Sequence, residues 1–260
     1  MKIPLTCPSV RYYNIEIRSE AFTDTDEQEA TLRARGNFIE EQYRINDVLD
    51  ALYACEGGCL LRVAHAAPDD VRPSDGEVVS ELVGTNPQKY KVHVVGKRPL
   101  VVACLDPEAF PTGHRGDEGK IDAHMAQLVK GAQTGHDGDG KPVILETGRT
   151  LSCPGEQELT VSVFASGWSD TSAADAKTVW QRHFSDEKRA LELTLERFFS
   201  CEQGEGSKCA AKPLVTESDQ GPVTLKEDHE EETKNGHKVI TRWSAAATVE
   251  VTFLVKCKPK

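Results

Sequence analysis

The chain has 260 residues, of which 28% are charged and 38% hydrophobic, a composition typical of a soluble globular protein. Its formal net charge of -11 argues against a nucleic-acid partner, because binding to a phosphate backbone needs clustered Lys and Arg. No run approaches the roughly 18 apolar residues of a membrane span, and the N-terminal residues lack the apolar stretch of a signal peptide.

A segment near the start of the chain returns in altered form later. Residues 5–58 align without a gap with residues 151–204, at an offset of 146 residues, and twelve positions are identical. Both segments begin with Leu, a hydroxyl residue, Cys and Pro. Such self-similarity predicts two copies of one structural unit.

Each copy is expected to begin with a strand. Apolar and polar side chains alternate over residues 13–17 and again over residues 159–163, which is the period of a half-buried strand. A turn is expected at residues 23–25 and 169–171, where short polar side chains favour a reversal. A second strand is then expected to run to Phe38 in the first copy and to Phe184 in the second.

A helix is expected next in each copy, because apolar residues recur at helical spacing. Ser185, followed by two acidic residues, is the expected N-cap of the second helix. The residues that form the apolar stripe are Ile45, Val48, Leu49, Leu52 and Tyr53 in the first copy, and Leu191, Thr194, Leu195, Phe198 and Phe199 in the second.

Further strands complete each copy, with a hairpin predicted at Asn235-Gly236 in the second and separate strands YKVHVV and PLVVACL in the first. The fold is therefore expected to be α+β, with two tandem copies of a β-β-α-β-β unit in which a helix packs on one face of an antiparallel sheet. The expected domains are residues 1–110 and 150–260. Residues 111–149, with a helix and a strand, are either the end of the first domain or a structured connector.

The stretches ELTVSVFASGWSDTSAADAKTV and NGHKVITRWSAAATVEVTF carry a resemblance to a known family. Within residues 156–255, the order of strand, turn, second strand, helix, long charged hairpin and final strand resembles the SIMPL family (signalling molecule that associates with a pelle-like kinase), whose bacterial members are periplasmic or secreted. The resemblance implies a binding or assembly role, often as an oligomer, and no catalytic residues. The eight cysteines and the doubling depart from the family pattern.

The cysteines divide four per copy, a pattern that predicts two disulfides in each domain and an extracellular location. The preferred pairing joins cysteines across the short loops after the helices and ties the start of each domain to its end, although four cysteines permit three connectivities. Zinc is an alternative because CEGGC spaces two thiolates closely, and reduced structural thiols are another. The preferred pairs are Cys55 with Cys59, Cys201 with Cys209, Cys7 with Cys104, and Cys153 with Cys257.

Other motifs indicate no metal site and no cofactor. The loop GHDGDGK, with His136, Asp137 and Asp139, lacks the full series of calcium ligands. The acidic run of residues 226–232 is interpreted as a solvated strand face, and Trp168, Trp180 and Trp243 are expected mainly to fill the core of the second copy.

Two functional hypotheses follow. The favoured one is a non-enzymatic, disulfide-stabilised, secreted tandem protein that binds an unidentified protein or surface partner, with an oligomer as one form that it can take. The alternative is a small hydrolase-type enzyme with a site between the two copies that uses His114, His124 or Asp139 of the 111–149 segment.

Overall fold

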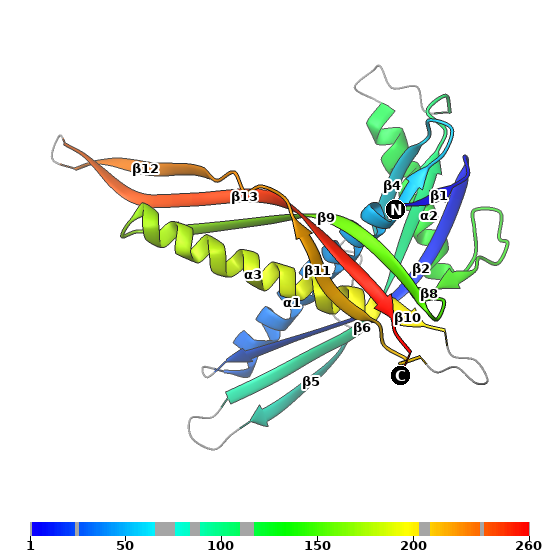
Figure 1. The fold of residues 1–260 in the computed structure, drawn as a ribbon, viewed down its shortest axis with the longest axis horizontal. Coiled ribbons are helices and arrows are strands. Elements are labelled where there is room, and N and C mark those ends of the chain that lie inside the picture. The colour runs from blue at the N-terminus through cyan, green and yellow to red at the C-terminus, as the bar shows by residue number, and fades with distance from the viewer. Residues whose placement is uncertain are drawn as a thin grey trace. The chain divides into compact units, whose positions relative to one another are not determined.

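The computed structural model describes residues 2–23, 26–65, 76–83, 89–109, 117–202, 209–234 and 237–259. This part of the chain is a mixed α and β structure with three helices and mostly antiparallel strands (Figure 1). It divides into two compact units, Met1–Thr150 and Leu151–Lys260. Within the described ranges, no helix is long and apolar enough to cross a membrane.

The first unit is built on a long central strand, β6, which replaces the two separate strands expected there. The strand β2 pairs with β6 antiparallel along its whole length, and β4 and β5 pair with the other edge of β6. The short strand β7 pairs parallel with the outer edge of β2. The elements are β1 (Ile3–Leu5), β2 (Ser9–Thr23), α1 (Glu27–Leu52), β3 (Tyr53–Cys55), β4 (Leu60–His65), β5 (Gly76–Val83), β6 (Lys89–Leu105), α2 (Asp117–Thr134) and β7 (Leu145–Glu146).

Helices cover both faces of this first sheet. The helix α1 packs on the face that carries the buried side chains of Tyr13, Ile15 and Ile17. The helix α2 packs on the opposite face, where Ile121 and Met125 join a core cluster with residues of β6. Residues 117–146 therefore pack within the first unit.

The second unit repeats this arrangement around β13 but has one covering helix in the part of the chain that the structure describes. The strand β9 pairs with one edge of β13 over 15 residues, and β11 and β12 pair with the other edge. The helix α3 packs on β9 and β13. The elements are β8 (Arg149–Leu151), β9 (Gly155–Ser169), α3 (Ala173–Phe198), β10 (Phe199–Cys201), β11 (Leu214–Gln220), β12 (Lys226–Lys234) and β13 (His237–Cys257).

The second strand predicted before each helix is wrong. The helices begin earlier, where the side chain of Asp26 accepts a hydrogen bond from the backbone N–H of Glu29 and that of Ser172 from the N–H of Asp175. Small or aromatic residues four apart then continue the buried stripe toward the N-terminus, with Ala176 and Trp180 as examples. The expected N-cap Ser185 lies in the middle of α3.

The two units share the lengths of their first elements. The pairs β1 and β8, β2 and β9, α1 and α3, and β3 and β10 each begin and end at the same offset of 146 residues. After Cys55 and Cys201 the lengths differ. The predicted turn residues Asp24 and Thr25 and the hairpin residues Asn235 and Gly236 lie outside the described residues, while β12 and β13 pair up to the flanking residues on either side of that hairpin.

Candidate binding surfaces

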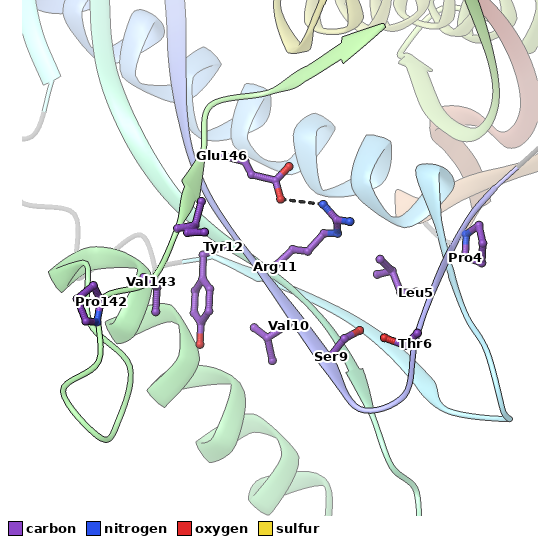
Figure 2. A pocket seen from close by; sticks show the side chains of 11 residues that line it. Pro4, Leu5, Thr6, Ser9, Val10, Arg11, Tyr12, Pro142, Val143 and Glu146 are labelled. Atoms are coloured by element: carbon purple, nitrogen blue, oxygen red, sulfur yellow. Dashed lines mark hydrogen bonds and ion pairs between the residues drawn. The ribbon is translucent and has the colours of Figure 1, made fainter. Parts of the chain in front are cut away.

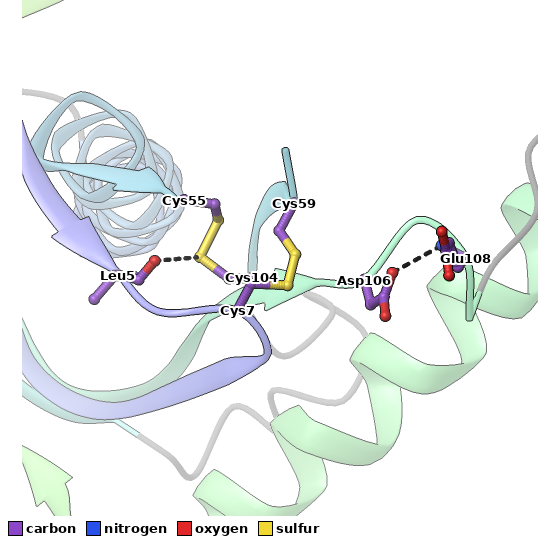
Figure 3. Close-up of a disulfide and its surroundings, with 7 residues drawn as sticks. All are labelled: Leu5, Cys7, Cys55, Cys59, Cys104, Asp106 and Glu108. Atoms are coloured by element: carbon purple, nitrogen blue, oxygen red, sulfur yellow. Dashed lines mark hydrogen bonds between the residues drawn. A yellow bond between two sulfur atoms is a disulfide. The ribbon is translucent and has the colours of Figure 1, made fainter. Parts of the chain in front are cut away.

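All eight cysteines lie in four pairs at disulfide distance, two in each unit. Figure 3 shows the two pairs of the first unit. The Cα–Cα distance is 6.1 Å in the first pair of each unit and 5.6 Å in the second. The prediction of two disulfides per unit is therefore supported, but the pairing differs from the preferred one. The pairs are Cys7–Cys59, Cys55–Cys104, Cys153–Cys209 and Cys201–Cys257.

The strand β1 explains the difference in pairing. It pairs parallel with β3, and the backbone N–H of Glu56 donates to the carbonyl of Leu5 at 2.9 Å. The chain then reverses at Gly57 and Gly58, which both have positive φ, and this reversal returns Cys59 to the chain that follows β1. In the second unit the N–H of Glu202 donates to Leu151 in the same way, at 2.8 Å. The preferred pairs Cys55–Cys59 and Cys201–Cys209 are therefore wrong, because they take no account of this contact between distant segments.

A groove of about 640 Å³ lies in the first unit, between the start of β2 and the segment that leads into β7 (Figure 2). Its walls are mainly apolar, with Pro4 and Val10 on one side and Pro142, Val143 and Ile144 on the other. The side chain of Ile144 is 87% exposed, and that of Val10 is 36% exposed. The groove therefore presents apolar side chains to solvent beside the place where β7 pairs with β2.

An ion pair forms the polar part of the groove. The guanidinium of Arg11 donates to the Glu146 carboxylate at 2.9 Å, joining residues 135 positions apart, and lies 5.6 Å from the centre of the Tyr53 ring. Burial by itself lowers the pKa of Arg11, but the nearby Tyr53 and Glu146 outweigh it and the pKa is raised. Arg11 is therefore charged throughout the neutral range.

Behind the ion pair, the buried hydroxyls of Tyr13 and Tyr53 are hydrogen-bonded to each other. Burial, followed by the bond to Tyr53, raises the pKa of Tyr13, so this residue stays neutral well above its usual range. The described residues that line the groove include no histidine. A fixed ion pair, a neutral Tyr13 and apolar walls suit the binding of an apolar group beside a hydrogen-bonding one.

A second exposed surface lies on the second unit, on the sheet face away from α3. Here Phe164 and Trp168 of β9 are 61% and 57% exposed. The guanidinium of Arg242 lies 5.0 Å from the centre of the Trp168 ring. At the equivalent place in the first unit, the Lys91 ammonium lies 5.2 Å from the ring of Phe22, which is 50% exposed. Both units therefore expose an aromatic ring beneath a cation.

The tryptophans do not behave alike. Trp180 is buried and stacks on Phe184, with ring centres 5.4 Å apart, as expected of a core residue. Trp243 is half-buried, and Trp168 lies on the surface. The expectation that the tryptophans mainly fill the core is therefore wrong for Trp168.

The residues of the alternative enzyme hypothesis lie in different settings. His114 lies outside the described residues, and His124 is half-buried on α2. Asp139 lies in the exposed loop after α2, with its carboxylate 3.8 Å from the Lys141 ammonium. In the same loop, one carboxylate oxygen of Asp137 accepts backbone N–H groups of Asp139 and Lys141. This carboxylate closes the turn, as short polar side chains often do.

The acidic run of residues 226–232 forms the exposed strand β12. Several of its carboxylates have cationic neighbours: Glu227 pairs with Lys177 at 2.9 Å, and Glu231 pairs with Lys238 at 2.9 Å. The bond from Lys238, followed by the one from His229, lowers the pKa of Glu231. Across the described ranges, no group of three or more His, Cys, Asp or Glu side chains is placed to hold a metal ion.

Comparison of the chain with protein-family models, with curated proteins and with solved structures finds no match.

Proposed function

We propose that this chain is a secreted, disulfide-stabilised, non-enzymatic protein of two tandem related units, and that the groove of the first unit binds a protein partner. The surface of this partner is expected to carry an apolar anchor residue flanked by hydrogen-bond acceptors. The apolar anchor fits between Val10 and Ile144, and the acceptors face the Arg11 guanidinium.

The observation that carries this proposal is the exposure of Ile144 at 87%, next to a fixed ion pair at the edge of a sheet. Covering apolar surface contributes roughly 25 cal/mol per Å², so an isoleucine left in water gains from a partner. Interfaces concentrate their affinity in a few apolar or Arg anchors ringed by polar groups. The groove holds both kinds of group within one short stretch.

Secretion is supported by the four cysteine pairs, because disulfides persist in oxidising compartments and are rare in the cytosol. A common origin of the two units is supported by the shared offset of their first elements. The SIMPL resemblance stays a prediction and would fit this role, including assembly into an oligomer.

Partner capture with matched variants tests the groove. The non-reduced protein is immobilised and exposed to a panel of extracellular proteins, and the dissociation constant of any partner is measured for three chains. We expect Ile144→Asp to weaken binding at least about tenfold, because a charge replaces the apolar anchor. The control is Leu32→Asp, which places the same charge on an exposed leucine (62%) of α1. Equal affinity of all three chains would exclude the groove.

The compartment has its own test, which is the intact mass after alkylation of the unfolded protein with and without prior reduction. A mass without alkylation in the unreduced sample is the expected result. Eight alkylated thiols would contradict both the disulfides and the secreted location. The alternative enzyme hypothesis would gain support from a hydrolytic activity that both His124→Ala and Asp139→Ala abolish.

A further inference from the structure

The strand β9 has one paired edge and one open edge. Along all 15 of its residues it pairs with β13, and no other strand in the described part of the chain pairs with it. An unpaired strand edge leaves backbone N–H and C=O groups to be satisfied by water or by an added strand. The open edge of β9 is therefore a place where another chain segment can bind.

In the first unit the equivalent edge is covered. The strand β7 adds to β2 in the parallel direction, with Leu145 beside Tyr12 and Glu146 beside Tyr13. At the offset of 146 residues, the positions that β7 covers correspond to Glu158 and Leu159 of β9. The chain itself therefore shows how a short strand pairs with this edge.

Both units close the other end of the edge in the same manner. In the first unit, the side-chain amide of Asn37 on α1 donates to the carbonyl of Glu20 at 2.9 Å. In the second unit, Nδ1 of His183 on α3 donates to the carbonyl of Ser166 at 2.7 Å. Asn37 and Glu20 correspond to His183 and Ser166 at the shared offset. What remains without an added strand in the second unit is the stretch between Glu156 and Phe164, where the neighbouring Gln157 side-chain amide donates to the Glu158 carbonyl at 2.9 Å.

The charge of this stretch differs from that of its counterpart. On β2, Arg11 pairs with the Glu146 carboxylate of the added strand. On β9 the equivalent of Arg11 is Gln157, and its exposed neighbours Glu156 and Glu158 lie on the opposite face of the strand. Glu156 pairs with Lys256 at 3.1 Å, and the Glu158 carboxylate is at the position equivalent to Tyr12, which lies beside Leu145 of β7. A strand that binds here therefore needs a basic residue where β7 carries Leu145.

We propose that the β9 edge between Glu156 and Phe164 binds an extended, basic segment of a partner protein as an added parallel strand. Backbone hydrogen bonds supply most of the affinity in this mode of recognition, and side chains on either side supply specificity. The exposed ring of Phe164 lies at the end of the stretch and can cover apolar side chains of the added strand. This surface is separate from the groove of the first unit.

Charge favours a basic segment over a second copy of the chain as the strand that binds this edge. Each copy carries a formal net charge of -11 and the same acidic edge, so self-pairing opposes like charges. A basic segment gains from the same field. Self-association through the edge is therefore an outcome that would contradict the proposal.

The probe is a peptide taken from the chain itself. Its sequence is that of residues 142–148, PVILETG, with the change Leu145→Lys, which places the lysine beside Glu158 in the register of β7, and the unchanged peptide is its control. Binding to the full, non-reduced protein is followed by amide hydrogen exchange. We expect the lysine peptide to slow exchange at residues 156–164 at least several-fold, and the unchanged peptide to bind at least about tenfold more weakly.

Three variants of the protein sharpen the test. Glu158→Lys should reverse the preference between the two peptides, while Asp219→Lys, which makes the same charge change on β11, should leave it unaltered. Ser162→Pro removes a backbone N–H from the open edge. The carbonyl of Ser166 bonds to His183 of α3 and so points away from β13, and the backbone groups of Ser162, four residues earlier on the same strand, point in the same direction. This change should abolish peptide binding in a protein whose tryptophan fluorescence shows it folded.

Three results would overturn the proposal. One is unchanged exchange at residues 156–164 with either peptide at millimolar concentration. Another is protection by the peptide at residues 12 and 13 alone, which would mean that it replaces β7. The third is a dimer of the free protein that Ser162→Pro dissociates, which would assign the edge to a second copy. Peptide binding by the Ile144→Asp variant separates this proposal from that of the groove, since it is expected to be unchanged.

Discussion

The two units of this protein use one frame and cover it differently. In the first, α1 and α2 lie on opposite faces of the sheet, and β7 covers part of the outer edge. In the second, as far as the structure describes it, α3 covers one face, while the other face and one edge stay open. The comparison teaches that the shared elements determine the inner core, and the segments outside them determine which surface of each sheet stays uncovered.

The largest expected effect comes from the inner disulfide of each unit. Cys201→Ala/Cys257→Ala should lower the free energy of unfolding of the second unit by about 4 kcal/mol, since the bond closes a separation of 56 residues. Tryptophan fluorescence in urea measures this unit alone, because Trp168, Trp180 and Trp243 all belong to it.

The matched change in the first unit is Cys55→Ala/Cys104→Ala, across a separation of 49 residues. It should have a similar effect on the first unit and leave the tryptophan transition in place. An equal shift of that transition by both pairs of changes would mean that the units unfold together.

The covering helix α2 gives the next largest effect. Met125→Ala removes a buried side chain (5% exposed) between α2 and β6, and should destabilise the first unit by about 2–4 kcal/mol. Amide exchange in β6 measures the loss. The control Gln127→Ala, on the exposed side of α2, should change nothing. If the tryptophan transition also moved, the second unit would depend on α2.

Gly167 marks a closer approach of helix and strand in the second unit than in the first. A Cβ at this position would clash with the backbone N of Trp180 and lie 2.5 Å from the Ala176 carbonyl oxygen. The equivalent residue of the first unit is Ala21, which is buried. Gly167→Ala should therefore cost about 1–3 kcal/mol, measured by the tryptophan transition. A neutral change would show that α3 can move away from β9 freely.

The smallest expected effect is a dependence of the first unit on pH. Burial lowers the pKa of His65, so the unfolded chain takes up this proton more readily than the folded one. The contribution of His65 to stability is therefore present above its usual pKa of 6.5 and is lost as the pH falls below it.

The measurement is the urea midpoint of the first unit between pH 7 and pH 5, read by a pulse of amide exchange at one fixed pH. His65→Gln cannot take up the proton and should show a shallower fall. Parallel curves for the two chains would mean that other groups cause the acid sensitivity.

Local pattern was sufficient for the helix ends and the first strands. The apolar spacing from Ile45 to Leu52 predicts the last turns of α1, and the alternation around Ile15 predicts β2. The first half of α1 gives little apolar contrast, because its buried residues include the small Ala30 and Ala34. The start of α3 could have been found from its N-cap, because Ser172 precedes the acidic Asp175 by three residues.

Contacts between distant segments could not be predicted in this way. The groove depends on β7 reaching β2, and the pair of Arg11 with Glu146 has no local sequence signature. The cysteine pairing depends on β1 lying beside β3. Both strands have only three residues, which is too short for a recognisable pattern in the sequence. The sequence places the cysteines in each unit correctly, but only the register of these short strands decides the partners.

The equal lengths of the first elements also set where these units can change in size. One residue inserted into α1 or α3 would turn every later side chain by about 100° and move the buried stripe away from its sheet. One residue inserted into β2 or β9 would send each following side chain to the opposite face. Directly after Cys55 and Cys201 the spacing to the next cysteine does differ, with Cys59 in one unit and Cys209 in the other. Insertions and grafted loops are therefore expected to be tolerated between Cys55 and Cys59 and between Cys201 and Cys209, and to be rejected within the paired strands and the helices.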